Sequence, residues 1–288
     1  AALFTGTFPH TNGSWANSMP LGDNVKTLGQ RLHDNGVHTA YIGKWHLDGG
    51  DYFGVGRCPD GWDPQYWYDM RKYLEELAPE DRVRSRQAKL SNDPGLTADF
   101  TFGHRCSNRA IDFLSRFNRD RFCLVLSYDE PHGPHVCPHP FSQMYKGYHF
   151  PKKRNIWDTL ENKPEHQRVW AGDRLQKDKD ALEIKPAGLL GCNSFVDSEI
   201  GRVIEAVDRY APDALVIYTS DHGDALHSHG LSSKGPAMYE EIVNIPFLVR
   251  WPKQTPAGAV NTNPVSHIDV VPTVLEAMGI PLPKVIEG

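Results

Sequence analysis

Three groups of charged and imidazole side chains could do chemistry in this 288-residue chain, and each comes directly after a short apolar segment. The groups are Lys44 with His46, Asp129 to His135, and Asp221 to Asp224. The apolar segments before them are residues 38–42, 122–128 and 214–219. In open parallel sheets, ligands bind beyond the carboxyl ends of the strands. The pattern therefore predicts a functional site at the ends of three strands.

Asp221 and His222 offer a carboxylate oxygen and an imidazole nitrogen side by side. Such a pair suits a divalent cation. Gly223 would let the backbone turn sharply after them. The alternative is an aspartate that caps a following helix, with a surface histidine beside it.

Lys44 and His46 are two residues apart, so in an extended segment both side chains leave the same face. A cation and a proton donor that point the same way suit an anionic substrate. The alternative is a solvated lysine beside a histidine with purely structural hydrogen bonds. His132 and His135, in a proline-rich loop, and Lys234 carry little information by themselves.

Apolar segments with strand and helix periodicity alternate along the chain. We expect helices at residues 24–35, 97–117, 189–210 and 268–278, and strands at 38–42, 122–128, 214–219 and 245–250. This order predicts an α/β fold with a mostly parallel sheet sandwiched by helices. Residues 48–69 should form an ordered loop, and the charged residues 141–185 a surface insertion.

Composition excludes several classes of protein. The net charge of −5 has no basic block, which argues against a nucleic-acid partner. No apolar run approaches the ~20 residues that span a bilayer. The five cysteines form no C-x-x-C pair, which favours buried thiols and a reducing compartment, cytoplasm over periplasm.

Four motifs, in this order, resemble those of the sulfatase family in the alkaline-phosphatase superfamily. They are Gly43-Lys44-Trp45-His46-Leu47, Pro131-His132, Thr219 to Asp224, and Lys234 to Glu241. Ala1 to Gly13 also resembles the segment that follows the family's nucleophile motif, C/S-x-P-x-R. The match covers nearly the whole chain, residues 1–288, as a sulfatase catalytic domain truncated at both ends.

The resemblance implies roles for the charged residues. Asp221 and His222 would bind a divalent metal, Ca²⁺ first, with Mg²⁺ and Mn²⁺ as alternatives. Lys44 and Lys234 would hold the sulfate oxygens. The nucleophile, a formylglycine made from Cys or Ser, would lie before Ala1 together with the acidic metal ligands.

Further roles follow from the same resemblance. His46 would orient the formylglycine, and His132 would contact sulfate or protonate the leaving group. Asn17 falls where the related phosphonate monoester hydrolases place a substrate-binding amide. All these side chains should gather in one cleft. Without its nucleophile, the chain alone should not turn over an aryl sulfate.

The implied reaction is hydrolysis of a small-molecule or saccharide sulfate ester, after maturation by a formylglycine-generating enzyme. One alternative is a phosphonate monoester or phosphodiester hydrolase on the same scaffold, and another is a non-catalytic anion-binding protein. Four aromatic residues could line a sugar-binding wall, although clustered aromatics are more often core; these are Trp62, Tyr66, Trp67 and Tyr68.

Overall fold

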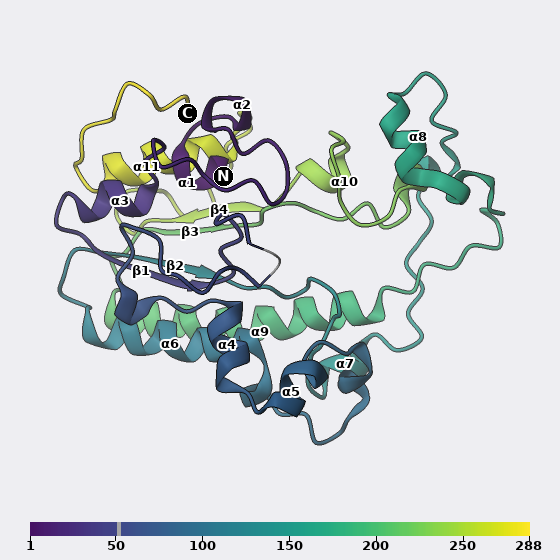
Figure 1. Cartoon of the computed structure of the whole chain (residues 1–288), viewed down its shortest axis with the longest axis horizontal. Helices are drawn as coiled ribbons and strands as arrows, with labels where there is room; N and C mark the ends of the chain where they lie inside the picture. Colours follow the sequence, from purple (N-terminus) through teal and green to yellow (C-terminus); the bar gives the residue numbers. More distant parts are fainter. Residues whose placement is uncertain (51–52) are drawn as a thin grey trace. The chain divides into compact units, whose positions relative to one another are not determined.

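A computed structural model describes residues 1–50 and 53–288 (Figure 1). Residues 51–52 belong to the expected ordered loop 48–69 and lie outside the described residues. The chain forms two compact units, and each is described by itself. The first comprises residues 1–143, 188–212 and 259–288, and the second comprises residues 144–187 and 213–258.

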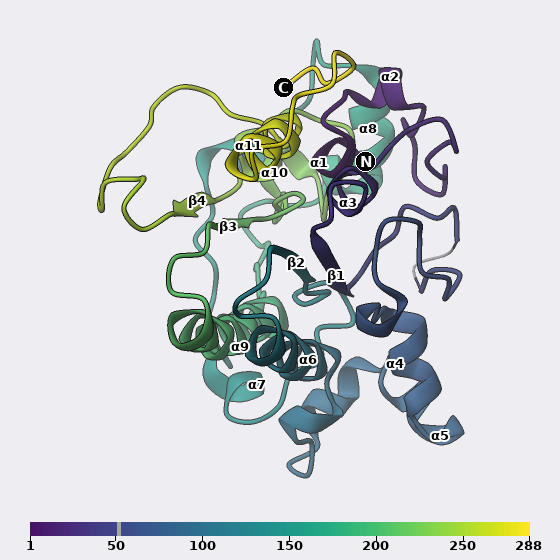
Figure 2. The ribbon, with the colours of Figure 1, turned by 90° about the vertical axis from the view of Figure 1, so that its left-hand side faces the viewer.

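The first unit is built on two parallel strands, β1 (His38–Gly43) and β2 (Phe122–Ser127). Their register runs from His38 opposite Phe122 to Gly43 opposite Ser127. Helices α6 (Phe102–Arg116) and α9 (Ala187–Tyr210) cover one face, and α1 (Ala2–Thr5), α3 (Leu28–His33) and α11 (Val270–Ala277) cover the other (Figure 2). The predicted α/β class is confirmed.

Helix α6 shows how the sequence sets a boundary. The Thr101 hydroxyl accepts a hydrogen bond from the His104 backbone amide and caps the helix at its N-terminus. The predicted helix began at residue 97, but residues 98–100 form a separate 3₁₀ turn, η3 (Ala98–Phe100). The apolar stripe of α6 is fully buried at Cys106, Ala110 and Phe113, each 0% exposed.

Helix α3 is shorter than predicted, because Thr27 and Gln30 form a capping box that starts the helix there. Val25, which lies within the expected helix 24–35, therefore precedes the helix. Leu28 and Leu32 pack with Val271 and Leu275 of α11. The predicted helix at residues 268–278 begins as a 3₁₀ turn, η7 (His267–Asp269), before α11.

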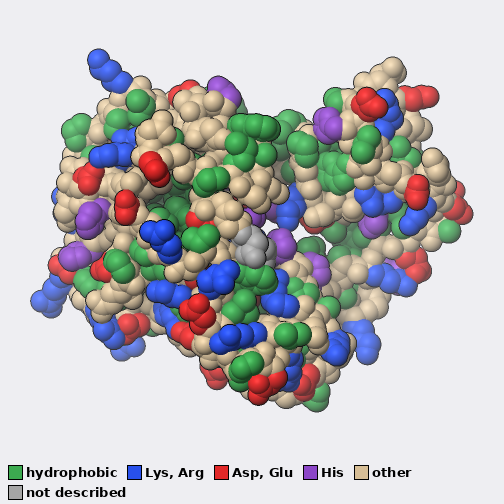
Figure 3. Space-filling view, in the orientation of Figure 1, with side chains coloured by type: hydrophobic (Ala, Val, Ile, Leu, Met, Phe, Trp, Pro, Cys, Tyr) green, Lys and Arg blue, Asp and Glu red, His purple; other side chains and the backbone are tan. Residues whose placement is uncertain are grey.

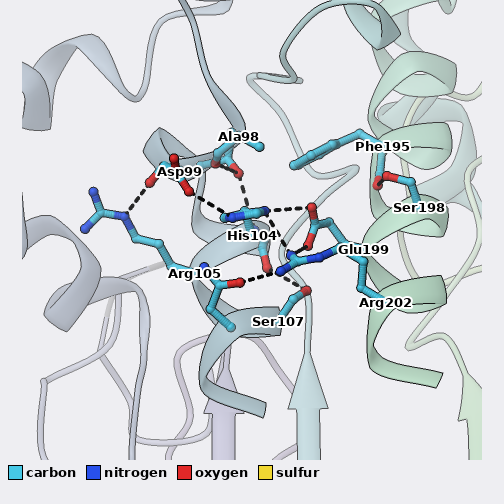
Figure 4. Close-up of polar contacts among 12 residues, drawn as sticks. Ala98, Asp99, His104, Arg105, Ser107, Phe195, Ser198, Glu199 and Arg202 are labelled. Carbon is cyan, nitrogen blue, oxygen red and sulfur yellow. Dashed lines mark hydrogen bonds and ion pairs between the residues drawn. The ribbon is translucent and has the colours of Figure 1, made fainter. Parts of the chain in front are cut away.

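A polar network joins α6 to α9 within the first unit (Figure 4). Glu199 is buried, and its carboxylate lies 2.8 Å from His104 Nδ1 and 2.5 Å from Arg202 Nη1. Because the carboxylate has partners on both oxygens, its burial is compensated. The contacts of His104 with Glu199 and Arg202 link one long helix to the other.

The second unit contains strands β3 (Val216–Thr219) and β4 (Phe247–Arg250), which pair antiparallel. Both strands were predicted, but as part of a mostly parallel sheet. A parallel crossover needs a connection that packs back over the sheet, usually a long helix. The only α-helix in the connection is α10 (Glu240–Val243), within the described residues.

The expected surface insertion at 141–185 has a core of its own. Leu160 and Ala171 are buried against Ala225, Leu231 and Ile242, which belong to the second unit. The segment contains α7 (Phe141–Met144) and α8 (Glu165–Ala171), with 3₁₀ turns η4 (Arg154–Trp157) and η5 (Gly172–Gln176). The segment has no helix or strand periodicity, so the sequence did not reveal the few apolar residues that are buried in this core.

The remaining elements are short. They are α2 (Pro9–Asn12), α4 (Met70–Glu76), α5 (Pro79–Arg84), η1 (Pro64–Tyr66), η2 (Ala88–Asn92) and η6 (Ser228–Gly230).

Trp62, Trp67 and Tyr68 are 2–3% exposed, which confirms the core interpretation of the aromatic cluster. Among the described helices, none is long and apolar enough to cross a bilayer. Acidic and basic side chains are interspersed over the visible face (Figure 3).

One buried carboxyl ties the loop after β2 to α6. Glu130 Oε1 accepts a hydrogen bond of 3.0 Å from the Gly103 amide in the first turn of α6. Its Oε2 is buried and has no hydrogen-bond partner among the described residues. Burial, with the charge of neighbouring Asp129, raises the pKa of Glu130 to about 7.

We predict that Glu130 makes the stability of the protein depend on pH. Unfolded, its carboxyl ionises near its ordinary pKa of 4.5, and folded near 7. Between these values only the unfolded state releases the proton, so the free energy of unfolding falls as pH rises through this window. In Glu130→Gln that part of the decline, on the order of 3 kcal/mol, should vanish.

Urea denaturation from pH 4 to pH 8 measures this effect. Exposed Glu205→Gln is the matched control and should keep the decline of the unchanged protein. Equal pH profiles for the Glu130→Gln variant and the unchanged protein would show that Glu130 is already ionised in the fold.

Candidate functional site

Lys44 and His46 leave the carboxyl end of β1, as predicted. Trp45 between them is 7% exposed and packs into the aromatic cluster, whereas the Lys44 side chain lies against Asp129 and is 17% exposed. The backbone is not extended throughout, however, because His46 has a positive φ of 57°. The expectation of an extended segment is therefore wrong at His46, where the chain already turns into the next loop.

Lys44 is held in place by the end of β2. Its amide donates to the Ser127 carbonyl at 2.9 Å, and its Nζ lies 3.3 Å from Asp129 Oδ1. The Tyr41 hydroxyl donates to the Lys44 carbonyl at 2.5 Å. The ammonium is thus positioned by a carboxylate whose side chain is only 5% exposed.

A second cation shares this carboxylate. Arg86 Nη1 lies 3.9 Å from Asp129 Oδ2, and Arg86 Nη2 donates to the Gly133 carbonyl at 3.2 Å. Two cations therefore lie beside one carboxylate at the ends of β1 and β2. The sequence analysis missed Arg86, because it follows α5 in a segment without any motif.

His132 lies in the loop after β2. Its amide donates to the Asp129 carbonyl at 2.9 Å, and its Nδ1 lies 2.9 Å from the Gly133 carbonyl. A proton on Nδ1 would satisfy that carbonyl and would set the tautomer of the imidazole. His135 Nδ1 lies 2.7 Å from the Pro131 carbonyl, as expected of a structural histidine.

Asp221 and His222 come directly after β3, and their side chains converge. His222 Nε2 lies 3.4 Å from Asp221 Oδ2. His222 Nδ1 lies 2.8 Å from the Gly223 carbonyl, the outer contact that commonly orients a metal-binding imidazole. No helix starts at this turn, so the alternative of a helix-capping aspartate is wrong.

The turn after His222 requires glycine. The Gly223 amide donates to the Ile242 carbonyl at 2.8 Å, and a Cβ on Gly223 would meet the Glu241 carbonyl oxygen at 2.1 Å. Only a residue without a side chain permits this approach. The close contact fixes the carboxylate and imidazole at the end of the strand.

The pair fits part of a cation site. An oxygen and a nitrogen converge, and the Asp221 side chain is 76% exposed, so an ion could reach it. Ca²⁺ takes six to eight ligands, however. Within residues 1–50 and 53–288, no cluster of three His, Cys, Asp or Glu side chains forms a metal site. A metal shell would need further ligands from elsewhere.

The other candidate residues are less constrained. Lys234 is half-buried between η6 and α10, and Asn17 is exposed in the turn after α2. Lys44, His46, His132 and Asn17 belong to the first unit, whereas Asp221, His222 and Lys234 belong to the second. The expectation that all of them share one cleft stays a prediction.

The sequence analysis also missed a histidine–aspartate pair in the second unit. His229 Nδ1 lies 2.7 Å from Asp158 Oδ2, and the imidazole stacks on Tyr239 at 3.7 Å between ring centroids. The two partners are 71 residues apart, so no local pattern could reveal them. The pair fastens the 144–187 segment to the loop that follows the Asp221–His222 turn.

Comparison with known proteins agrees with these motifs. The Sulfatase family model matches residues 1–280. The uncharacterised sulfatase YidJ of Escherichia coli is 43% identical over 303 residues, which cover 100% of this chain and 59% of YidJ. The chain therefore spans less than two thirds of that relative.

Solved structures share the fold. BT4656, solved in complex with its substrate D-glucosamine-2-N,6-O-disulfate, aligns with a TM-score of 0.75 and 21% identity over 100% of this chain and 68% of that one. The phosphonate monoester hydrolase of Silicibacter pomeroyi aligns with a TM-score of 0.71 and 21% identity over 100% and 64%. These alignments show that the fold is shared. The family model over residues 1–280 shows that the chain belongs to the sulfatase family.

Proposed function

We propose that this protein hydrolyses sulfate monoesters of saccharides. The observation that carries the proposal is the convergence of Asp221 and His222 at the end of β3, in a chain of the sulfatase family. The saccharide part is supported by BT4656, whose substrate is a sulfated glucosamine. Because the chain spans 59% of YidJ, the activity is proposed for the full-length protein.

The Asp221 carboxylate and the His222 imidazole are proposed as ligands of a divalent metal, Ca²⁺ before Mg²⁺ or Mn²⁺. A metal there would supply positive charge to the sulfate oxygens. We infer that the formylglycine nucleophile, made by a formylglycine-generating enzyme, and the remaining metal ligands come from residues outside 1–288. His46 is proposed to orient this nucleophile.

Lys44 and His132 are proposed to act on the sulfate group. A sulfate monoester carries one negative charge, and an ammonium held by Asp129 at 3.3 Å can bind its oxygens without reorganising. His132, whose ring orientation is set by the contact of Nδ1 with the Gly133 carbonyl, is proposed to deliver a proton to the leaving oxygen. Lys234 is proposed as the second cation, and Asn17 as a substrate-binding amide.

Phosphonate monoester hydrolysis is the second candidate. The Silicibacter pomeroyi hydrolase has this fold, and Asn17 and His222 fit it. Lys44 and His46 favour sulfate, because the resemblance places uncharged residues there in the phosphonate hydrolases. A non-catalytic anion-binding protein is the third candidate, and a C/S-x-P-x-R motif encoded upstream of Ala1 would exclude it.

Replacement of Lys44 tests the choice of substrate. In the full-length enzyme, Lys44→Ala should lower kcat/KM for an aryl sulfate by about one to two decades, because a charge-assisted contact of roughly 1.5–3 kcal/mol is lost. Lys26→Ala removes an exposed lysine that pairs with Asp34 and should have no effect. His46→Ala should lower chiefly kcat.

Steady-state kinetics with a sulfate and a phosphonate monoester of the same leaving group provide the measurement. The sulfate should be the faster substrate. A tenfold preference for the phosphonate, or full sulfate turnover by Lys44→Ala, would favour the phosphonate hydrolase. The 288-residue chain alone should show no turnover.

Calorimetric titration with Ca²⁺ tests the proposed ligands. In the full-length protein, Asp221→Asn and His222→Ala should each weaken Ca²⁺ binding by roughly tenfold or more, since even residues behind the ligands change affinity 10–100-fold. Asp213→Asn, an exposed aspartate paired with Lys253, is the control and should bind as before. Unchanged affinity in both test variants would place the metal elsewhere.

A further inference from the structure

A small cavity in the second unit is surrounded by basic side chains. Its volume is about 50 Å³, and it is lined by Arg174, Lys177, Lys179, Leu182, His227 and Gly230. No carboxylate is among these lining residues. A concave surface with charges of one sign concentrates its field and attracts counter-ions.

Backbone carbonyls accept hydrogen bonds from two of the basic side chains, Arg174 and Lys179. Carbonyls have no net charge, so both side chains keep their positive charge. Arg174 donates from Nε to the Gly230 carbonyl at 3.2 Å and from Nη2 to the Trp170 carbonyl at 2.5 Å. Lys179 Nζ donates to the Arg174 carbonyl. Arg174 and Lys179 are thus fixed at the cavity, and the exposed Lys177 adds a third cation to its lining.

The positive charge in this cavity is not compensated. Among the described residues, no carboxylate forms an ion pair with Arg174, Lys177 or Lys179. Burial and then the charges of Lys177 and Arg174 lower the pKa of Lys179. Burial and then Arg174 lower the pKa of His227, although Asp224 opposes this.

The nearby carboxylates of Asp178 and Asp224 do not line the cavity. The Asp178 carboxylate accepts hydrogen bonds from the Asp180 and Ala181 amides at 2.9 and 3.3 Å, so these local backbone amides orient it. Asp224 Oδ1 accepts from the Leu226 amide at 2.9 Å. A bound oxyanion would supply the missing negative charge and accept hydrogen bonds from Lys and Arg donors.

The cavity adjoins the loop that carries the proposed site. The Ala225 amide donates to the Ser233 carbonyl at 2.7 Å, which closes the turn containing His227 and Gly230. Gly230 precedes Lys234 by four residues, so their Cα atoms are at most roughly 14 Å apart. A saccharide with one sulfate at Lys234 could therefore present another group to the cavity.

We propose that Arg174, Lys177, Lys179 and His227 form an anion subsite for a second sulfate group of the substrate, distinct from the sulfate that is hydrolysed. This inference rests on the proposed sulfatase function for the identity of the ligand. The occupation of the cavity by sulfate does not depend on that function and is tested separately.

The first experiment titrates the 288-residue chain with sodium sulfate and measures the pKa of the His227 imidazole by NMR. Sodium chloride at matched ionic strength is the reference. Sulfate should raise the His227 pKa in a saturable manner beyond the effect of chloride. Lys177→Gln removes an exposed lysine and should weaken sulfate binding roughly tenfold or more. Exposed Lys146→Gln, in the same unit but outside the cavity, is the control.

Arg174→Gln should weaken sulfate binding further but also removes two contacts to the backbone, so Lys177→Gln is the decisive variant. A His227 pKa that responds equally to sulfate and chloride would overturn the subsite. So would equal sulfate affinity in Lys177→Gln and the unchanged chain.

The second experiment uses the full-length enzyme and a hexosamine with one or two sulfate groups. Lys177→Gln should lower the ratio of kcat/KM for the disulfated over the monosulfated sugar roughly tenfold, and Lys146→Gln should leave it unchanged. Sulfate binding without this change in ratio would overturn the role in substrate binding. If no sulfate ester is turned over, the proposed function fails, while the titration still decides whether the cavity binds sulfate.

Discussion

The close approach of Gly43 to Ser127 is the constraint on which the first part of the site depends. A Cβ on Gly43 would lie 1.9 Å from the Ser127 carbonyl oxygen, and the residue has φ 129°. Glycine lets the ends of β1 and β2 meet, and the Lys44 amide then bonds to that same carbonyl. Lys44 and Asp129 consequently leave neighbouring strand ends and form their ion pair.

The ion pair has a chemical consequence. Asp129 is nearly buried beside Lys44 and Arg86, so the charge of its carboxylate is compensated by these cations. Fixed cations at a strand end can stabilise an anion at little reorganisation cost, which water cannot do. If the proposed function is right, His132 in the same loop also belongs to the site. The contact of its Nδ1 with the Gly133 carbonyl sets the orientation of the imidazole ring.

The second unit positions its candidate site residues by a different set of contacts. A turn that only Gly223 permits presents Asp221 and His222, and the His229–Asp158 pair fastens the 144–187 segment beside the following loop. That segment brings Arg174, Lys177 and Lys179 next to His227. A segment that looked like a solvated insertion therefore supplies both a core and a cluster of cations.

The sequence by itself determined the α/β class, the strands β1 to β4 and the helices α3, α6, α9 and α11, because apolar periodicity and abrupt polar strand ends are local signals. It also predicted Lys44, His132, Asp221 and His222 as site residues by motif, and these assignments stay predictions. It could not identify Arg86, the buried Glu130 or the cationic cavity, because these depend on partners far apart along the chain. It also could not predict that β3 and β4 pair antiparallel. Tertiary structure decided these features, since desolvation and charge pairing arise only when distant segments pack together.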